Sequence, residues 1–179
     1  DEPNPIGVYG IASLQGELAV QQHASHVIIR SGWLFGRYKK GLIKSWIRSA
    51  IKNDGQLQVQ RRRFSPTHTG DLAAAILAIA QQIDCAANVW GLYHYSGLET
   101  KTESEFAEQT LKYAANHDEQ IYQLLDNKKI IERDVRAPEI HSATLSSKKI
   151  SDTFGIKQKS WHGELKETVK SLYANKNKS

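Results

Sequence analysis

A short apolar run between two helical segments constrains the fold of this chain most. Residues 27–29 read Val-Ile-Ile, and a continuous apolar run of this kind is typical of a parallel strand buried on both faces. Residues 9–23 before it and 40–52 after it carry apolar side chains at helical spacing. Because parallel strands need crossover helices, this order predicts a layered α/β fold.

The alternation of helix and strand continues to the end of the chain. Residues 31–37 are expected to form a loop. Two further strands are expected, at 56–60 and 90–95. Helices are expected from a Thr69 cap to 83, after a Thr102/Glu105 capping box, and near 121–125. Another helix is capped by Ser146 or Ser147 and ended by Gly155, and the last helix spans 161–173.

Length and composition bound the class of protein. A chain of 179 residues forms one domain with a core, or two small lobes. No apolar run approaches the roughly 20 residues of a membrane span. The single Cys85 excludes an intrachain disulfide and favours a reducing, cytoplasmic location. The seven His residues lack metal-ligand spacing, so no metal site is expected. A chain without Met that opens at Asp1 is expected to be a piece of a longer protein.

The first predicted helix carries the sequence Tyr9-Gly-Ile-Ala-Ser13-Leu-Gln-Gly-Glu17. It resembles the YGxxKxxGE helix of short-chain dehydrogenases that act on sugar nucleotides, with Ser13 where the family has its catalytic Lys. The resemblance implies that Tyr9 is the catalytic proton donor. Residues four apart share a helix face, so a Lys at position 13 would favour the ionised phenol. A Tyr on an amphipathic helix is alternatively a packing residue.

Four further motifs follow in one order and spacing. They are His26 to Gly36 with Arg30, Trp33 and Phe35; Phe64-Ser-Pro-Thr-His-Thr-Gly-Asp-Leu-Ala73; Gly91-Leu-Tyr-His-Tyr-Ser-Gly97; and Arg136-Ala-Pro138 followed by Phe154-Gly-Ile156 and Trp161. Together with the first helix, they resemble the dTDP-4-dehydrorhamnose reductases from Asp1 to about Leu172. The family is part of the extended short-chain dehydrogenase/reductase superfamily.

This resemblance implies an α/β fold: the C-terminal part of a Rossmann-type extended short-chain dehydrogenase plus a small mixed α/β substrate-binding lobe. Residues 1–38 would be the trailing edge of the dinucleotide-binding domain, 39–173 mostly the sugar-nucleotide lobe, and 174–179 a disordered tail. The full-length protein would use NADP or NAD. The chain has no GxGxxG loop, so we expect this fragment alone not to bind the cofactor tightly and a missing N-terminal Rossmann half to supply it.

Positive charge is concentrated between Arg37 and Arg63, a stretch of +8 in a chain of +5. Lys40, Lys44, Arg48 and Lys52 form one helical stripe, which is either a solvated face or a binding face. Arg61, Arg62 and Arg63 are the stronger candidates, because guanidinium forks bind diphosphate oxygens in pairs. They lead into Ser65 and Thr67, which in the resembling family lie beside the nucleotide diphosphate.

Aromatic residues give a second set of candidates. Trp33 follows the carboxyl end of a strand, where α/β sheets bind ligands. It either contacts the substrate, as the resemblance implies, or only packs against the end of the sheet. Trp46, Trp90 and Trp161 lie in apolar patterns and are expected in the core.

Three functions stay open. The first is an NAD(P)-dependent reductase of a dTDP-4-keto-6-deoxy sugar in dTDP-rhamnose synthesis, with Tyr9 as proton donor and with Trp33 and Arg61 to Arg63 on the substrate. The second is a non-catalytic, sugar-nucleotide-binding or regulatory relative of the same family, which the loss of the Lys at position 13 favours. The third is a basic nucleic-acid-binding module, which ranks last because no recognised motif supports it. The oligomeric state, a homodimer included, stays open, and no membrane partner is expected.

Overall fold

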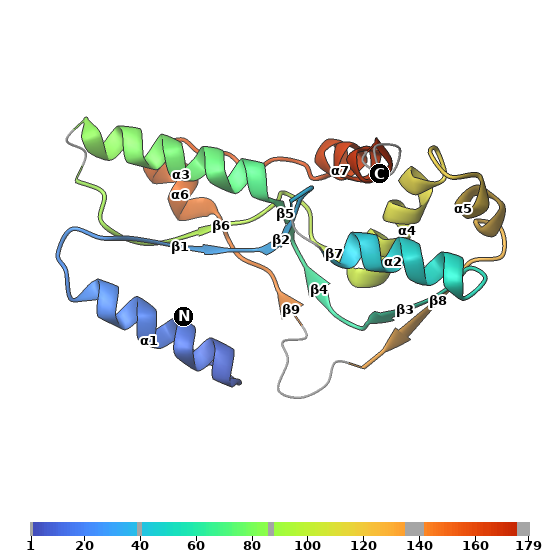
Figure 1. The fold of residues 1–179 in the computed structure, drawn as a ribbon. Coiled ribbons are helices and arrows are strands. Elements are labelled where there is room, and N and C mark those ends of the chain that lie inside the picture. The colour runs from blue at the N-terminus through green and yellow to red at the C-terminus, as the bar shows by residue number, and fades with distance from the viewer. Residues whose placement is uncertain (1, 39–40, 86–87, 135–141, 175–179) are drawn as a thin grey trace.

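The computed structural model describes residues 2–38, 41–85, 88–134 and 142–174. Its elements alternate along the chain and form two parts, which lie side by side in Figure 1. In chain order they are α1 Val8–Gln21, β1 Val27–Ser31, β2 Trp33–Phe35, α2 Leu42–Lys52, β3 Gln56–Gln60, β4 Arg63–Phe64, β5 Pro66–His68, α3 Thr69–Asp84, β6 Gly91–Tyr95, β7 Lys101–Thr102, α4 Glu103–Ala114, α5 Glu119–Leu124, β8 Lys129–Arg133, β9 Ser142–Ala143, α6 Lys148–Phe154 and α7 His162–Ala174.

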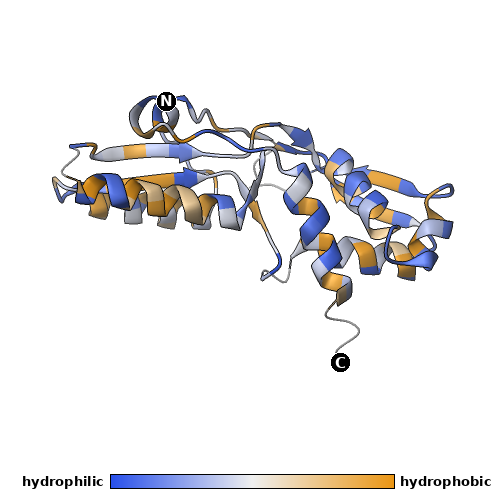
Figure 2. Ribbon diagram, turned by 90° about the horizontal axis from the view of Figure 1, so that it is seen from above, coloured by the Kyte–Doolittle hydropathy of each residue, from blue (hydrophilic) through white to orange (hydrophobic). Residues whose placement is uncertain are grey.

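The first part is a two-stranded parallel sheet between helices. β1 pairs with β6 from Val27 opposite Gly91 to Ser31 opposite Tyr95. Helices α3 and α6 cover one face of this pair, and α1 lies on the other side (Figure 1). A small core joins α3, α6 and β6 through Ala75, Ile79, Tyr93, Tyr95, Ile150 and Phe154. Figure 2 shows the apolar residues spaced along α3.

The second part packs short strands against helices α2, α4, α5 and α7. β2 pairs with β5, β3 with β8, and β4 with both β7 and β9. The Phe106 ring of α4 lies at the centre, with ring centroids 5.1 Å from Trp161 and 6.1 Å from Trp46. Edge-to-face contacts of this kind add stability beyond area burial. Trp46 and Trp161 are buried, as predicted.

Several local predictions are confirmed. Thr102 and Glu105 form the complete capping box of α4, and Gly155 ends α6 in the left-handed conformation with φ 68°. The Ser146 hydroxyl accepts a 3.5 Å hydrogen bond from the amide of Lys148 at the start of α6. Ser147 does not cap α6, because its hydroxyl accepts a hydrogen bond from the Ser96 amide instead.

Four expectations were wrong. Residues 33–35 form β2 rather than loop, because they find a parallel partner in β5. Residues 129–133 form β8, paired with β3, where the sequence analysis places no element. Thr69 is the first residue of α3 rather than its cap, and His68 in the cap position makes no side-chain capping bond. Trp90 is exposed, because it precedes β6 and does not lie within it.

Two predictions lie partly outside the described residues. Arg136, Ala137 and Pro138 are among residues 135–141, and the expected tail begins at Ala174, the last residue of α7. The predicted domain boundary between residues 38 and 39 stays a prediction.

Candidate functional site

The carboxyl ends of β1 and β6 meet at a tightly packed junction. The Gly32 amide donates to the Tyr95 carbonyl at 3.0 Å, and the Gly97 amide donates to the Thr67 hydroxyl at 3.1 Å. That hydroxyl donates in turn to the Ser65 carbonyl at 3.0 Å. These hydrogen bonds fix the positions of the side chains around the junction. Carboxyl ends of parallel strands are where α/β sheets bind ligands.

Ser65 and Thr67, predicted to contact substrate, are both buried in this junction. The Ser65 hydroxyl lies 3.2 Å from that of Thr100, and the Thr67 hydroxyl both donates and accepts within the chain. Their visible role is to hold β5 against the glycines. A substrate contact by either residue stays a prediction.

Tyr9, the predicted proton donor, lies at the exposed start of α1. Its side chain is 88% exposed, and Ser13 donates from its hydroxyl to the Tyr9 carbonyl at 2.9 Å. Position 13 is therefore one turn beyond Tyr9, on the same side of the helix. Both residues are open to any ligand or protein unit that covers α1.

A bidentate ion pair ties α1 to the sheet. None of the residues of α1, all of them described, is buried. The Arg30 guanidinium of β1 donates to the two carboxylate oxygens of Glu17 at 2.8 and 2.6 Å. His94 lies opposite Arg30 in the β1–β6 register, and burial together with the Arg30 charge lowers the pKa of its imidazole. The neutral imidazole of His94 does not repel the Arg30 guanidinium beside it.

The ion pair makes the attachment of α1 depend on pH. The hydrogen bonds and charge of Arg30 lower the pKa of Glu17 from its ordinary value of 4.5. The stabilisation is fully present above pH 4.5 and is lost as the pH falls through the lower, folded-state value.

We expect amide-exchange protection in α1, corrected for intrinsic rates, to be constant from pH 8 to 5 and to fall in acid. A Glu17→Gln variant should show weak protection without this pH step; equal protection in both chains would contradict the assignment.

The three consecutive arginines differ in their surroundings. Arg61 lies 3.0 Å from Asp134 and 3.5 Å from Glu132, in exposed pairs. Arg62 donates from Nε to Glu103, whose carboxylate is almost wholly buried. Arg63 is exposed at the start of β4. The predicted cluster is therefore largely neutralised within the chain, which reduces its value as a polyanion surface.

Arg62 and Glu103 line a cavity of about 550 Å³ between α2 and β3. The other described residues that line it are Leu42, Ser45, Trp46, Ser49, Leu57, Gln58, Val59, Gln60, Arg133 and Asp134. Arg133 makes no ion pair with any described residue, whereas Asp134 is paired with Arg61. Two guanidinium groups therefore border one cavity, and the carboxylate of Glu103 holds one of them in place.

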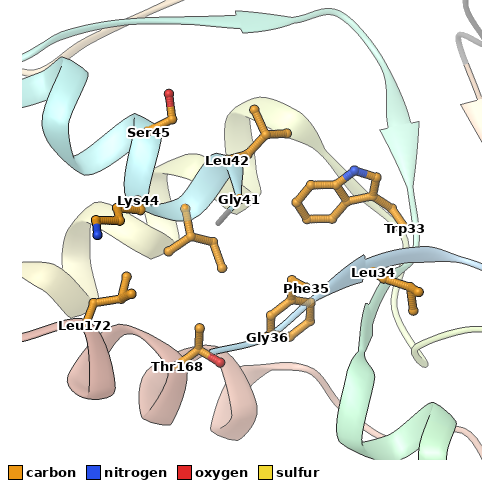
Figure 3. Close-up of a pocket in the computed structure, with 11 residues that line it drawn as sticks. Trp33, Leu34, Phe35, Gly36, Gly41, Leu42, Lys44, Ser45, Thr168 and Leu172 are labelled. Atoms are coloured by element: carbon orange, nitrogen blue, oxygen red, sulfur yellow. The ribbon is translucent and has the colours of Figure 1, made fainter. Parts of the chain in front are cut away.

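Trp33 lies on β2 and lines a different cavity, of about 410 Å³, shown in Figure 3. Its ring centroid lies 5.1 Å from that of Phe64 and 6.0 Å from that of Phe106, so one side packs on the core. None of the described residues lining this cavity is Tyr9 or one of the three arginines. The structure thus divides the predicted substrate residues between separate surfaces.

The sequence reasoning missed Glu103 and Arg133. Glu103 is next to the capping residue Thr102, in the first turn of α4, and the sequence analysis does not single it out. Arg133 lies in β8, a strand that the sequence pattern did not reveal. The contact between Arg62 and Glu103 also includes the backbone, because the Glu103 amide donates to the Arg62 carbonyl at 3.1 Å.

Comparison with known proteins decides the family. The model of the RmlD substrate-binding domain matches residues 1–174. This chain belongs to the RmlD substrate-binding domain family. The resemblance expected from the sequence is confirmed, and the α/β fold class with it.

Curated relatives agree with this family. The dTDP-4-dehydrorhamnose reductase of Sinorhizobium fredii is 29% identical over 182 residues, covering 96% of this chain and 59% of the relative. The methionine adenosyltransferase 2 subunit beta of Xenopus laevis is 30% identical over 112 residues, 59% of this chain and 33% of the relative. This RmlD-family chain therefore spans about three fifths of the length of the reductase it matches.

Solved structures show the same fold. A dTDP-4-dehydrorhamnose reductase from Clostridium acetobutylicum matches with a TM-score of 0.78 and 23% identity, covering 96% of this chain and 58% of that one. A Bacillus anthracis dTDP-4-dehydrorhamnose reductase in complex with NADP matches with a TM-score of 0.71 and 24% identity, over 94% and 56% of the two chains.

The described residues contain neither a membrane-spanning helix nor a metal-binding cluster. Among the helices that the structure describes, none is long and apolar enough to cross a membrane. Within the same residues, no group of three or more His, Cys, Asp or Glu side chains is arranged to hold a metal ion.

Proposed function

We propose that this chain binds the sugar nucleotide of a cytoplasmic NAD(P)-dependent reductase that acts on a dTDP-4-keto-6-deoxy sugar. The family match over residues 1–174 carries the proposal. It is supported by curated relatives that bear the name dTDP-4-dehydrorhamnose reductase in several bacteria. The sugar nucleotide would lie against residues 39–173, and residues 1–38 would belong to the dinucleotide-binding domain.

The cavity between α2 and β3 is the proposed site of the nucleotide diphosphate. Arg62 and Arg133 border it, and guanidinium groups bind phosphate oxygens through paired, charge-assisted hydrogen bonds. Glu103 is a positioning residue in this proposal, because its buried carboxylate fixes the Nε side of Arg62. Gln58 and Gln60 of β3 and Ser45 and Ser49 of α2 add polar groups along the same cavity.

The chain's own residues do not fit a dinucleotide. No GxGxxG loop occurs in the sequence, and the described part of the Rossmann-type sheet is only the β1–β6 pair. Parallel sheets are normally covered on both faces and contain more than two strands. The exposed apolar residues Tyr9, Ile11 and Leu18 of α1 support a further α/β unit that adds strands beside β1. A nicotinamide bound to that unit would supply the hydride.

Tyr9 is the proposed proton donor to the carbonyl oxygen of the keto sugar. Its exposed hydroxyl is available to a substrate held between α1 and the added unit. Ser13 gives the phenol no charged neighbour in the next turn.

A non-catalytic role in the same family is the second candidate. Ser13 in place of a Lys favours it. The similarity to the methionine adenosyltransferase 2 subunit beta, a subunit of another enzyme, favours it as well. In that role the cavity beside Arg62 would still bind a nucleotide, and no reduction would follow. Binding alone therefore supports both candidates, and turnover separates them.

Calorimetric titration with dTDP tests the binding proposal. An Arg133→Gln variant is expected to bind dTDP about tenfold more weakly, because one charge-assisted contact is lost. Arg48→Gln is the matched control, since Arg48 is an exposed cation of α2 outside the lining of this cavity. No binding of dTDP, or equal losses in both variants, would contradict the proposed site. Tight, steeply salt-dependent binding of an oligonucleotide, weakened by Arg48→Gln, would support the nucleic-acid module instead.

A further inference from the structure

Helix α3 presents an apolar side that no described element covers. Residues 72–83 contain no charged side chain, and Ile76 and Leu77 are 49% and 59% exposed. The exposed sides of α2, α4 and α7, in contrast, carry lysine, arginine or glutamate. A helix at a protein surface normally presents polar and charged residues to water. The composition of α3 is therefore that of a helix with a partner on its outer side.

The exposed residues of α3 form one stripe opposite the core. The buried residues of this helix are Asp71, Ala75 and Ile79. On the opposite side, five exposed residues follow one another at spacings of three and four: Gly70, Ala73, Leu77, Ala80 and Asp84. These spacings keep the five residues, called here the outer stripe, on one side of the helix, and they are typical of helix–helix seams. Figure 2, seen from above, shows apolar residues along α3.

The position of the outer stripe distinguishes its partner from the cofactor unit proposed above. α3 and α6 form one helix layer over the β1–β6 pair (Figure 1). In a layered α/β fold, a unit that adds strands beside β1 places its own helices beside α3, within the same layer. Such a unit would contact a flank of α3. The outer stripe, which faces away from the sheet, would stay exposed.

The outer stripe is complementary to itself in an antiparallel arrangement. Leu77 is the central residue of the five, so a twofold axis at Leu77 places Asp84 of each copy next to Gly70 of the other. Gly70 lies in the first turn of α3, where the cap residue His68 makes no side-chain capping bond. A helix start carries a partial positive charge, which favours a carboxylate beside it. The antiparallel pair therefore joins opposite charges at both ends.

The charged groups around the start of α3 agree with this arrangement. Two carboxylates that line the adjacent cavity have partners, Glu164 with His68 at 3.3 Å and Glu167 with Lys170 at 3.5 Å. Arg37 lines the same cavity, is exposed, and forms no ion pair with a described residue. A carboxylate from a second copy would thus meet an unpaired guanidinium as well as the helix start.

We infer that the outer stripe of α3 is the interface of a homodimer, in which a second copy of this chain packs its own α3 antiparallel across Leu77. Contact along one helix about 24 Å long is at the small end of specific interfaces. We therefore expect a dissociation constant in the micromolar range. The inference does not depend on the proposed reductase function, because it uses no substrate or cofactor residue.

Sedimentation velocity over a micromolar concentration series tests the interface. Leu77→Lys should weaken dimerisation at least about 100-fold, because the twofold axis brings two cations into one apolar contact. Val8→Lys is the matched control, since Val8 is an exposed apolar residue of α1, on the other side of the sheet. A natural chain that stays monomeric would overturn the inference. So would a dimer that is lost in the Val8 variant and kept in the Leu77 variant.

Asp84→Lys separates a contact between copies from a structural role. A cation at the C-terminal end of α3 is favourable for the helix itself, so Tm should not fall. Dimerisation should nevertheless weaken about tenfold, because each copy then directs a cation at the other's helix start. Unaltered dimerisation in the folded variant would show that the antiparallel arrangement is wrong.

Cysteine crosslinking tests the same arrangement independently. Cys85 is exposed just beyond the end of α3, and the antiparallel pair holds the two Cys85 residues about 24 Å apart. The natural chain should therefore form no interchain disulfide under mild oxidation, whereas Leu77→Cys in a Cys85→Ser background should form one at the axis. A disulfide through Cys85 would contradict the arrangement.

Fusion of the Leu77→Cys chain to a cofactor unit identifies the occupant of the outer stripe. The crosslink should persist in the fusion, because the cofactor unit lies beside α3. A monomeric fusion whose new thiol is protected from labelling would show that the cofactor unit covers the stripe, and would overturn the inference.

Discussion

Replacing Ser13 with lysine is expected to raise the rate of keto-sugar reduction by about 100-fold or more, in an enzyme formed from this chain and a dinucleotide-binding unit. A cation one turn from Tyr9 stabilises the phenolate that forms when the proton leaves. The site accepts the longer side chain, because Ser13 is exposed and its hydroxyl donates to the Tyr9 carbonyl of the same helix.

A chimera makes this measurement feasible. Under the proposed function, the segment of the Sinorhizobium fredii relative outside the aligned region is the candidate cofactor unit, and it would be fused to this chain. Ser13→Met is the control for side-chain length without charge, and Tyr9→Phe in the Ser13→Lys background should abolish the gain. A gain that survives Tyr9→Phe would contradict the role of Tyr9. No gain in a folded chimera that binds NADPH and dTDP would favour the non-catalytic relative.

Gly97→Ala is expected to lower the free energy of unfolding by about 3 kcal/mol or more. Gly97 is buried where β6 meets β5, and an added Cβ would overlap the backbone carbonyl oxygen of Pro66. Pro66 is itself fully buried, so it has little room to move. The overlap would also strain the hydrogen bond from the Gly97 amide to Thr67.

Thermal unfolding measures this effect. For a chain of this size, a loss of about 3 kcal/mol lowers Tm by roughly 6–12 °C. Gly163→Ala is the matched control, because a Cβ there, near the start of α7, meets no atom within 4 Å. Similar Tm values for the Gly97 variant and the unmodified chain would show that the junction of the sheet with β5 is looser than described.

Elements determined by local sequence were predictable. The amphipathic pattern of residues 42–52 and the Thr102/Glu105 capping box each act within a few residues. The two-residue strands β4, β7 and β9 were not predictable, because they exist only through pairing with one another. Trp90 was misplaced for a related reason, since the apolar pattern gives no exact start for β6.

The candidate site was only partly predictable. The motif around Tyr9 and the arginines pointed to sugar-nucleotide chemistry, and the family match agrees with it. The partners of those arginines were hidden, because Glu103 lies 41 residues beyond Arg62 and Asp134 lies 73 residues beyond Arg61. Tertiary ion pairs at such separations have no signature in a single sequence, and they decide which cations remain for a ligand.

A crystal structure of this chain with dTDP tests the account most directly. The diphosphate is predicted to lie in the cavity between α2 and β3, with phosphate oxygens within hydrogen-bonding distance of Arg62 and Arg133. Glu103 should keep its contact with Arg62 in the complex. A diphosphate bound along the exposed cations Lys44, Arg48 and Lys52 of α2, with the Arg62 cavity empty, would contradict the account.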